Sequence, residues 1–158
     1  MGQDHRSLTA FLLIGGVALA LCTSLAWALW PSKPTGVADP TDATQVALGM
    51  EVYLQHCASC HGVNLEGQPN WRIRKPNGRL PAPPHDETGH TWHHPDEHLF
   101  KATKLGFNPP LVSEEYQSDM PGFADVLTDA EIWATLAYIK SRWPEKILRR
   151  HAAAAAAR

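Results

Sequence analysis

The sequence predicts a helical chain, with one membrane-spanning helix followed by a small helical domain. Two observations support this. Residues 8–30 are uncharged and mainly apolar over 23 positions, which is long enough to cross a bilayer as an α-helix. Further along the chain, apolar residues recur at helical spacing after two capping signals, at Asp42 and at Thr128.

Composition limits the class of protein. The chain has 158 residues, enough for one modest domain and an appendage. Its 14 Lys and Arg residues nearly balance its 16 Asp and Glu residues, which argues against a nucleic-acid-binding protein. The 13 prolines and 11 glycines indicate long loops, so a domain this small needs a stabilising element besides its helices.

Residues 8–30 are predicted to remain as a single-pass transmembrane anchor in the lipid bilayer. Residues 1–7 form a short leader whose Arg6 gives a weak positive-inside signal, which puts the N-terminus in the cytoplasm and the following domain in the periplasm. A cleaved signal peptide is the alternative, because Ala26-Trp27-Ala28 has the pattern of a cleavage site. The apolar run is longer than the usual core of a signal peptide, so we expect the anchor.

A stripe of small residues follows one face of this anchor. Its members recur at every fourth position and are Gly16, Ala20, Ser24 and Ala28. Small residues on one face let another helix backbone approach closely. The stripe predicts a partner within a larger membrane assembly, although small residues are common in any anchor, and the sequence leaves both interpretations open.

An extended linker and a first helix are predicted next. Residues 31–41 hold three prolines, a glycine and small polar residues, which is typical of a tether. Asp42 followed by Gln45 resembles a capping box that starts a helix. Its apolar stripe is expected to face the core and consists of Val46, Met50, Tyr53 and Cys57.

This helix delivers the chemical centre of the chain, Cys57-Ala58-Ser59-Cys60-His61. The spacing C-x-x-C-H is that of a c-type haem attachment site, in which two thiols bond the haem vinyl groups and the next imidazole, here His61, binds the iron. A zinc site needs two more ligands at finger-like spacing, and a redox dithiol needs a βαβ context. Neither surrounds the motif, so the sequence predicts one haem c attached through Cys57 and Cys60.

Two further helices are predicted downstream. One begins at His94-Pro95-Asp96-Glu97 and ends at Gly106. The other begins at a second capping box, Thr128 with Glu131, and ends before Pro144. Its apolar stripe consists of Ile132, Leu136, Ile139 and Trp143.

Five histidines lie within fourteen positions: His85, His90, His93, His94 and His98. Imidazole is a ligand for copper and zinc, so a bis-histidine haem or a second metal site is an alternative use of this segment. The spacing fits no defined ligand motif, and the start of the next helix accounts for part of the cluster. We therefore expect no second metal.

Three motifs together resemble the class I cytochrome c family: G-x-x-x-Y-x-x-x-C-A-S-C-H-G beginning at Gly49, Met120-Pro121-Gly122-Phe123, and the closing T-D-A-E-I-W-A-T-L-A-Y-I-K. The resemblance covers about residues 42–146. It implies an all-α fold wrapped around one haem, with the first and last helices crossing near Gly49 and Tyr138. It also implies that a proline carbonyl in the loop after His61 accepts the second N–H of that imidazole, but it does not identify the proline.

Met120 is the predicted second axial ligand. It lies in the loop that matches the family, whereas Met50 is expected to face the core and Met1 to lie across the membrane. His/Met ligation raises the reduction potential and fills both axial positions. We therefore expect no enzyme, but a membrane-anchored monohaem cytochrome that passes single electrons between membrane redox complexes.

Two alternatives to a mobile carrier stay open. One is a fixed haem c subunit of a respiratory or photosynthetic membrane complex. The other is a haem enzyme or sensor with an open axial site.

The remaining segments give weaker signals. The proline-rich loop after the haem motif holds an aromatic ring and four cations: Trp71, Arg72, Arg74, Lys75 and Arg79. These could pair with haem propionates or form a docking patch, but a solvated basic loop is slightly favoured. Residues 147–158 are predicted to be a C-terminal tail whose alanines favour a helix but offer no chemistry.

Overall fold

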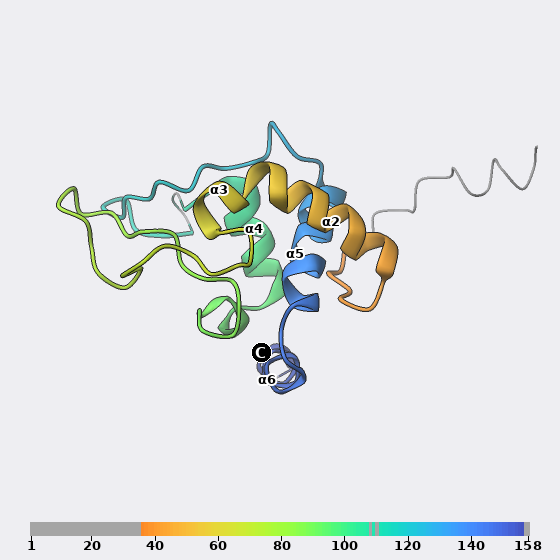
Figure 1. Cartoon of the computed structure of the whole chain (residues 1–158). Helices are drawn as coiled ribbons and strands as arrows, with labels where there is room; N and C mark the ends of the chain where they lie inside the picture. The colour runs from red at the N-terminus through yellow and green to blue at the C-terminus, as the bar shows by residue number, and fades with distance from the viewer. Residues whose placement is uncertain (1–35, 108, 110, 157–158) are drawn as a thin grey trace, which may run out of the picture. The chain divides into compact units, whose positions relative to one another are not determined.

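A computed structural model describes residues 36–107, 109 and 111–156, which belong to one structural unit (Figure 1). This part of the chain is helical and contains no strand, in agreement with the predicted all-α fold. The elements are α2 (Ala43–His56), α3 (Ala58–His61), the 3-10 helix η1 (Thr91–His93), α4 (Asp96–Leu105), α5 (Asp129–Ser141) and α6 (Glu145–Ala156).

The predicted leader, the anchor with its stripe of small residues, and the first part of the linker, residues 1–35, lie outside the described residues. Among the helices of the described ranges, none is both long enough and apolar enough for a membrane crossing.

Helix α2 begins after Asp42, as predicted. The Asp42 carboxylate accepts hydrogen bonds from the N–H groups of Thr44 and Gln45, at 2.9 and 3.1 Å. These bonds satisfy two of the N–H groups that the start of a helix leaves without an intrahelical partner. The Gln45 side chain bonds the chain before the helix: it donates to the Val37 carbonyl and accepts from the Asp39 N–H. The first turn of α2 is therefore tied to the residues that lead into it.

Helices α2 and α5 cross at Gly49. A Cβ atom on Gly49 would lie 1.9 Å from the carbonyl oxygen of Ala134, far inside van der Waals contact, so only glycine fits here. Tyr138, which we predicted to pack on Gly49, lies one turn further along α5 and packs on Tyr53, with ring centroids 5.4 Å apart. The crossing was predicted correctly, but its partner residue was wrong, because the closest approach of two backbones leaves no room for a ring.

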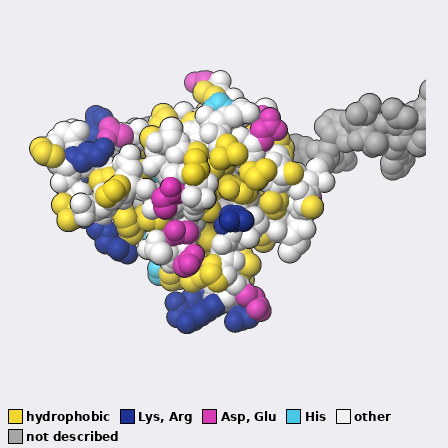
Figure 2. All heavy atoms as spheres, in the orientation of Figure 1, with side chains coloured by type: hydrophobic (Ala, Val, Ile, Leu, Met, Phe, Trp, Pro, Cys, Tyr) yellow, Lys and Arg dark blue, Asp and Glu magenta, His cyan; other side chains and the backbone are white. Residues whose placement is uncertain are grey.

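Met50 is 46% exposed, so the prediction that it faces the core is wrong. The buried residues of α2 are Gly49, Val52 and Tyr53. Contact with α5 at Gly49 turns the next residue, Met50, about 100° away from the core. Figure 2 shows apolar side chains gathered on the surface over this helix. The exposed large apolar residues of α2 are Leu48, Met50 and Leu54.

Helices α4 and α5 have the predicted ends. Helix α5 starts with a complete capping box, in which the Glu131 carboxylate accepts the Thr128 N–H at 2.7 Å and the Thr128 hydroxyl accepts the Glu131 N–H at 3.3 Å. The predicted apolar stripe is buried throughout, at Ile132, Leu136, Ile139 and Trp143. Helix α4 follows Pro95 and stops before Gly106.

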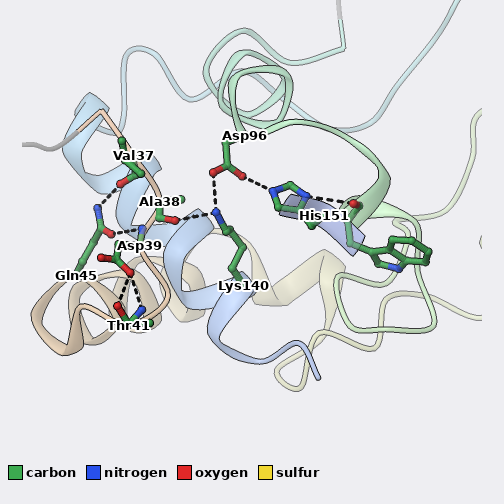
Figure 3. A network of polar contacts seen from close by, with 9 residues as sticks. Val37, Ala38, Asp39, Thr41, Gln45, Asp96, Lys140 and His151 are labelled. Carbon is green, nitrogen blue, oxygen red and sulfur yellow. Dashed lines mark hydrogen bonds and ion pairs between the residues drawn. The ribbon is translucent and has the colours of Figure 1, made fainter. Parts of the chain in front are cut away.

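Residues 147–156, which the sequence analysis assigns to the tail, belong to α6. This helix packs against η1, and its Ile147 and His151 are buried. The His151 ring bridges two elements: its Nε2 lies 2.8 Å from an Asp96 carboxylate oxygen, and its Nδ1 lies 3.1 Å from the Trp92 carbonyl oxygen (Figure 3). The folded unit therefore includes the segment after residue 146.

Asp96 connects α6 to α5 as well (Figure 3). Its second carboxylate oxygen lies 2.6 Å from Nζ of Lys140, and this ammonium also donates to the Ala38 carbonyl at 2.8 Å. Burial raises the pKa of Asp96, but the hydrogen bonds from His151 and Lys140 outweigh burial, and the net effect lowers the pKa below its usual value. One carboxylate thus joins three helices and the chain before α2.

We predict that Asp96→Asn lowers the free energy of unfolding by about 3 kcal/mol at pH 7, because it leaves the buried Lys140 ammonium without a counter-charge. The lowered pKa of Asp96 means that the carboxylate stabilises the fold above the unfolded-state pKa of about 4 and that this contribution is lost as the pH falls through the folded value. The difference between wild type and variant should therefore shrink below pH 4 in guanidinium titrations followed by circular dichroism.

Asp129→Asn is the matched control for this prediction. The Asp129 carboxylate pairs with Lys104 but is 57% exposed, so its loss should change the free energy of unfolding by less than about 1 kcal/mol. An effect of Asp96→Asn no larger than that of the control, or one that stays constant below pH 4, would contradict the role given to the buried carboxylate.

Candidate haem-binding site

The short helix α3 brings together three of the four predicted site residues. Cys57 directly precedes it, and Cys60 and His61 are its last two residues. Cys57 is half-buried, Cys60 is exposed and both are free thiols, whereas His61 is only 7% exposed. Residues three apart lie on the same face of a helical turn, so Cys57 and Cys60 share a face and His61 directly follows them.

The Cys57 thiol does not have the properties of a redox dithiol. Burial, and secondarily the neighbouring Cys60, raises its pKa to about 11. Catalytic C-x-x-C pairs work with a lowered thiol pKa, because the thiolate is the nucleophile. A neutral thiol at pH 7 therefore argues against thiol–disulfide exchange at this motif and is compatible with a thioether link.

The imidazole of His61 is held by a backbone carbonyl. Its Nδ1 lies 2.9 Å from the Pro83 oxygen, and since a carbonyl can only accept, Nδ1 carries the proton and Nε2 keeps its lone pair. Burial lowers the pKa of His61, while the Pro83 carbonyl acts in the opposite direction, and the net lowering keeps the ring neutral at pH 7. Of the prolines in this loop, the structure identifies Pro83 as the one that bonds the ring.

Two neighbouring side chains also fix this part of the chain. The His85 ring stacks on the His61 ring, with ring centroids 4.0 Å apart and an interplanar angle of 21°. The Nδ1 atom of His85 lies 2.8 Å from the Thr91 hydroxyl. The Tyr53 hydroxyl donates to the Gly62 carbonyl at 2.8 Å, which ties α2 to the residue after His61. Neither role was predicted from the sequence.

The other histidines of the cluster are engaged in ring contacts. His90 stacks on Trp71, His93 on Trp92 and His94 on His98. In the part of the chain that the structure describes, no group of three or more His, Cys, Asp or Glu side chains is arranged to hold a metal ion.

Met120 lies on a separate segment, residues 118–124, and is half-buried. Its N–H donates to the Ser118 hydroxyl at 3.0 Å. Downstream, the Phe123 ring lies edge-on to His56, with centroids 6.4 Å apart, and His56 directly precedes Cys57. The segment therefore reaches the end of α2 that carries the attachment motif, although no hydrogen bond among the described residues joins Met120 to the motif.

The cations of the proline-rich loop make specific contacts, and two of them are half-buried. Nζ of Lys75 lies 3.2 Å from the Asp119 carboxylate, and the Arg79 guanidinium pairs with the same carboxylate. The Arg72 guanidinium lies 4.0 Å from the centroid of the Trp71 ring. Two of these cations thus pair with the residue next to Met120, a contact that the sequence analysis did not predict.

These residues fit a covalently attached haem c. Two thiols at three-residue spacing and a neutral imidazole with a free Nε2 are the donors that this group requires. In addition, Nε1 of Trp92 is buried without a hydrogen-bond partner among the described residues, and Trp92 packs against the same apolar cluster as Cys57. A haem propionate has the acceptor oxygens that such a donor needs.

Comparisons with known proteins support the same cofactor. The family model for cytochrome c matches residues 46–143. The chain is similar to the proteins named cytochrome bc1 complex cytochrome c subunit of Mycobacterium bovis and Mycobacterium tuberculosis, with 37% identity over 73 residues, or 44% of this chain and 26% of the relative. The protein of the same name from Mycobacterium leprae is 37% identical over 54 residues, or 34% of this chain and 19% of the relative.

The chain therefore spans about a quarter of the length of the curated relatives that it matches. No solved structure matches the chain significantly.

We predict that the wild-type chain, produced with the c-type haem maturation machinery, keeps its haem on a denaturing gel stained for haem. The double variant Cys57→Ala/Cys60→Ala should lose this stain, because both thioether links are removed. Cys22→Ala, a matched change at the third cysteine, should keep it. Haem that stays on the denatured double variant would show that the attachment lies elsewhere.

Proposed function

The chain belongs to the cytochrome c family, and we propose that it transfers single electrons through one haem c whose iron is held by His61 and Met120. The observation that supports this most is the bond from His61 Nδ1 to the Pro83 carbonyl, which leaves the lone pair of Nε2 free on the residue that directly follows the second cysteine. When bound, haem c supplies the one-electron iron couple.

The two proposed axial ligands explain why the site suits electron transfer. The Pro83 carbonyl fixes the plane of the His61 ring and increases its basicity. A thioether such as that of Met120 in the second position raises the reduction potential. If His61 and Met120 held the iron, both of its axial positions would be filled by protein donors and dioxygen and peroxide would not bind, so we assign no catalytic residue.

We predict that Met120→Ala lowers the reduction potential and allows carbon monoxide to bind the ferrous protein, because one axial position loses its protein donor. Met50→Ala is the matched control, since Met50 is 46% exposed on α2 and has no proposed role. It should change neither property. Redox titration and carbon monoxide binding kinetics are the measurements. Rapid carbon monoxide binding by the wild-type protein would favour the alternative of a haem enzyme or sensor with an open axial site.

We further propose that residues 8–30 anchor the protein in the membrane, with the N-terminus in the cytoplasm and the haem domain in the periplasm. The uncharged 23-residue stretch and the position of Arg6 support this orientation. Of the predicted linker 31–41, the residues before Val37 then act as a tether that limits the reach of the haem domain. Val37, Ala38 and Asp39 are hydrogen-bonded to the folded domain and do not belong to the tether. A tether raises the effective concentration of the domain near its partners, which suits exchange of electrons between membrane redox complexes.

A fixed haem subunit of a respiratory or photosynthetic complex is the second candidate. It is favoured by the similarity to proteins named as the cytochrome c subunit of the cytochrome bc1 complex. The similarity extends over about a quarter of the length of those proteins, so the assembly named for them comes to this chain only as a proposal. In this second candidate the stripe of Gly16, Ala20, Ser24 and Ala28 is the contact with a neighbouring helix.

Purification in mild detergent distinguishes the two candidates. If the protein is a fixed subunit, other chains should co-purify with it, and Gly16→Leu/Ser24→Leu should release them because bulky side chains prevent close helix approach. Ala18→Leu lies on another face of the same helix and should retain them. A wild-type protein that purifies alone supports the mobile carrier, and partners retained by the double variant would exclude the stripe as the contact.

A further inference from the structure

A tight turn in the proline-rich loop, residues 75–79, places two cations, Lys75 and Arg79, side by side at its two ends. The Lys75 carbonyl accepts the Gly78 N–H at 2.9 Å, and the Lys75 N–H donates to the Arg79 carbonyl at 2.8 Å. Pro76 at the second position and Gly78 with a φ of +81° suit such a turn. The backbone bonds therefore place Lys75 and Arg79 side by side at the base of the turn.

Both cations bind the same carboxylate. Lys75 pairs with one oxygen of Asp119 and Arg79 pairs with the other, across sequence separations of 44 and 40 residues. Figure 1 shows the loop after α3 and the segment between α4 and α5 running together at one end of the described unit. Figure 2 shows Lys or Arg side chains touching an Asp or Glu side chain at the same end.

A second contact joins the turn to the same segment. The Arg74 guanidinium lies 5.8 Å from the centroid of the Tyr116 ring, within the range of a cation–π interaction. Arg74 also donates to the Gly78 carbonyl at 2.6 Å, so the turn itself orients this guanidinium. Tyr116 and Asp119 both precede Met120, and the turn therefore holds the upstream side of the methionine.

The residues after Met120 are held by hydrogen bonds to α4. The N–H groups of Phe123 and Ala124 both donate to the Lys104 carbonyl at 3.0 Å, which fastens this part of the chain to the end of α4. Met120 lies between these two attachments in backbone that is neither helix nor strand. Ordering such backbone costs conformational entropy, so each attachment favours the state in which the thioether stays in place.

We propose that Asp119, held by Lys75 and Arg79, is a positioning residue that keeps Met120 on the haem iron. This inference rests on the proposed function, because it takes Met120 as the axial ligand. A single exposed ion pair is weak, but here one carboxylate binds two cations whose spacing is fixed by the turn. The ion pairs act on the equilibrium between bound and released Met120, and a few-fold change in that equilibrium constant can be measured.

Competition by imidazole for the ferric iron tests the inference. Asp119→Asn should raise the apparent affinity for imidazole about 3- to 10-fold and should lower the reduction potential, because the methionine is released more readily. Asp119→Glu keeps the charge and should restore most of both properties. Asp125→Asn is the matched control, because Asp125 forms no ion pair with any described residue, and it should change neither.

Two further measurements test whether the ion pairs of Asp119 cause the effect on imidazole affinity. Raising the salt concentration should increase imidazole affinity in the wild type but not in Asp119→Asn, since exposed charges are screened. Arg79→Gln should increase imidazole affinity in the wild-type background and add little in the Asp119→Asn background.

The outcomes separate this inference from the function on which it rests. If Met120→Ala binds imidazole much better than the wild type while Asp119→Asn does not, the positioning role is excluded and the ligand assignment stands. If Met120→Ala binds imidazole no better than the wild type, the ligand assignment itself fails.

Discussion

The position of the haem motif depends on the crossing of α2 and α5. Gly49 lets the α2 backbone touch Ala134 of α5, and one turn later Tyr53 packs on Tyr138. The Tyr53 hydroxyl then bonds the Gly62 carbonyl, directly after His61. The attachment helix α3 is therefore placed by the contact between α2 and α5, and the two thiols and the imidazole take their positions from it.

The long loop after α3 contacts one proposed axial ligand, His61, and the residue next to the other, Asp119 beside Met120. Its Pro83 carbonyl bonds the ring of His61, and its Lys75 and Arg79 pair with Asp119, next to Met120. Proline restricts the backbone on both stretches, at Pro76 within the turn and at Pro83 itself. A loop without regular secondary structure thus acts as a scaffold for the two sides of the site, which accounts for its proline content.

The sequence predicted the features that depend on local chemistry. The cap at Asp42, the capping box at Thr128 and the C-x-x-C-H spacing are set by neighbouring residues, and the structure has the caps and helix ends where they were expected. The crossing of α2 and α5 followed from the family resemblance, but other features that depend on packing between distant segments were not predictable. Met50 matched the helical period yet faces outward, and neither Pro83 nor the pairing of Asp119 with Lys75 and Arg79 has a signal in the nearby sequence. The wrong partner for Gly49 has the same origin, since a helical period gives the face of a helix but not the residue that faces it.

The docking of α6 also defines the smallest fragment worth producing. Because His151 bonds both the Asp96 carboxylate and the Trp92 carbonyl, a truncation at Pro144 would remove one of the two partners of Asp96 and uncover the Trp143 ring beneath His151. Recombinant versions of the haem domain should extend at least through His151.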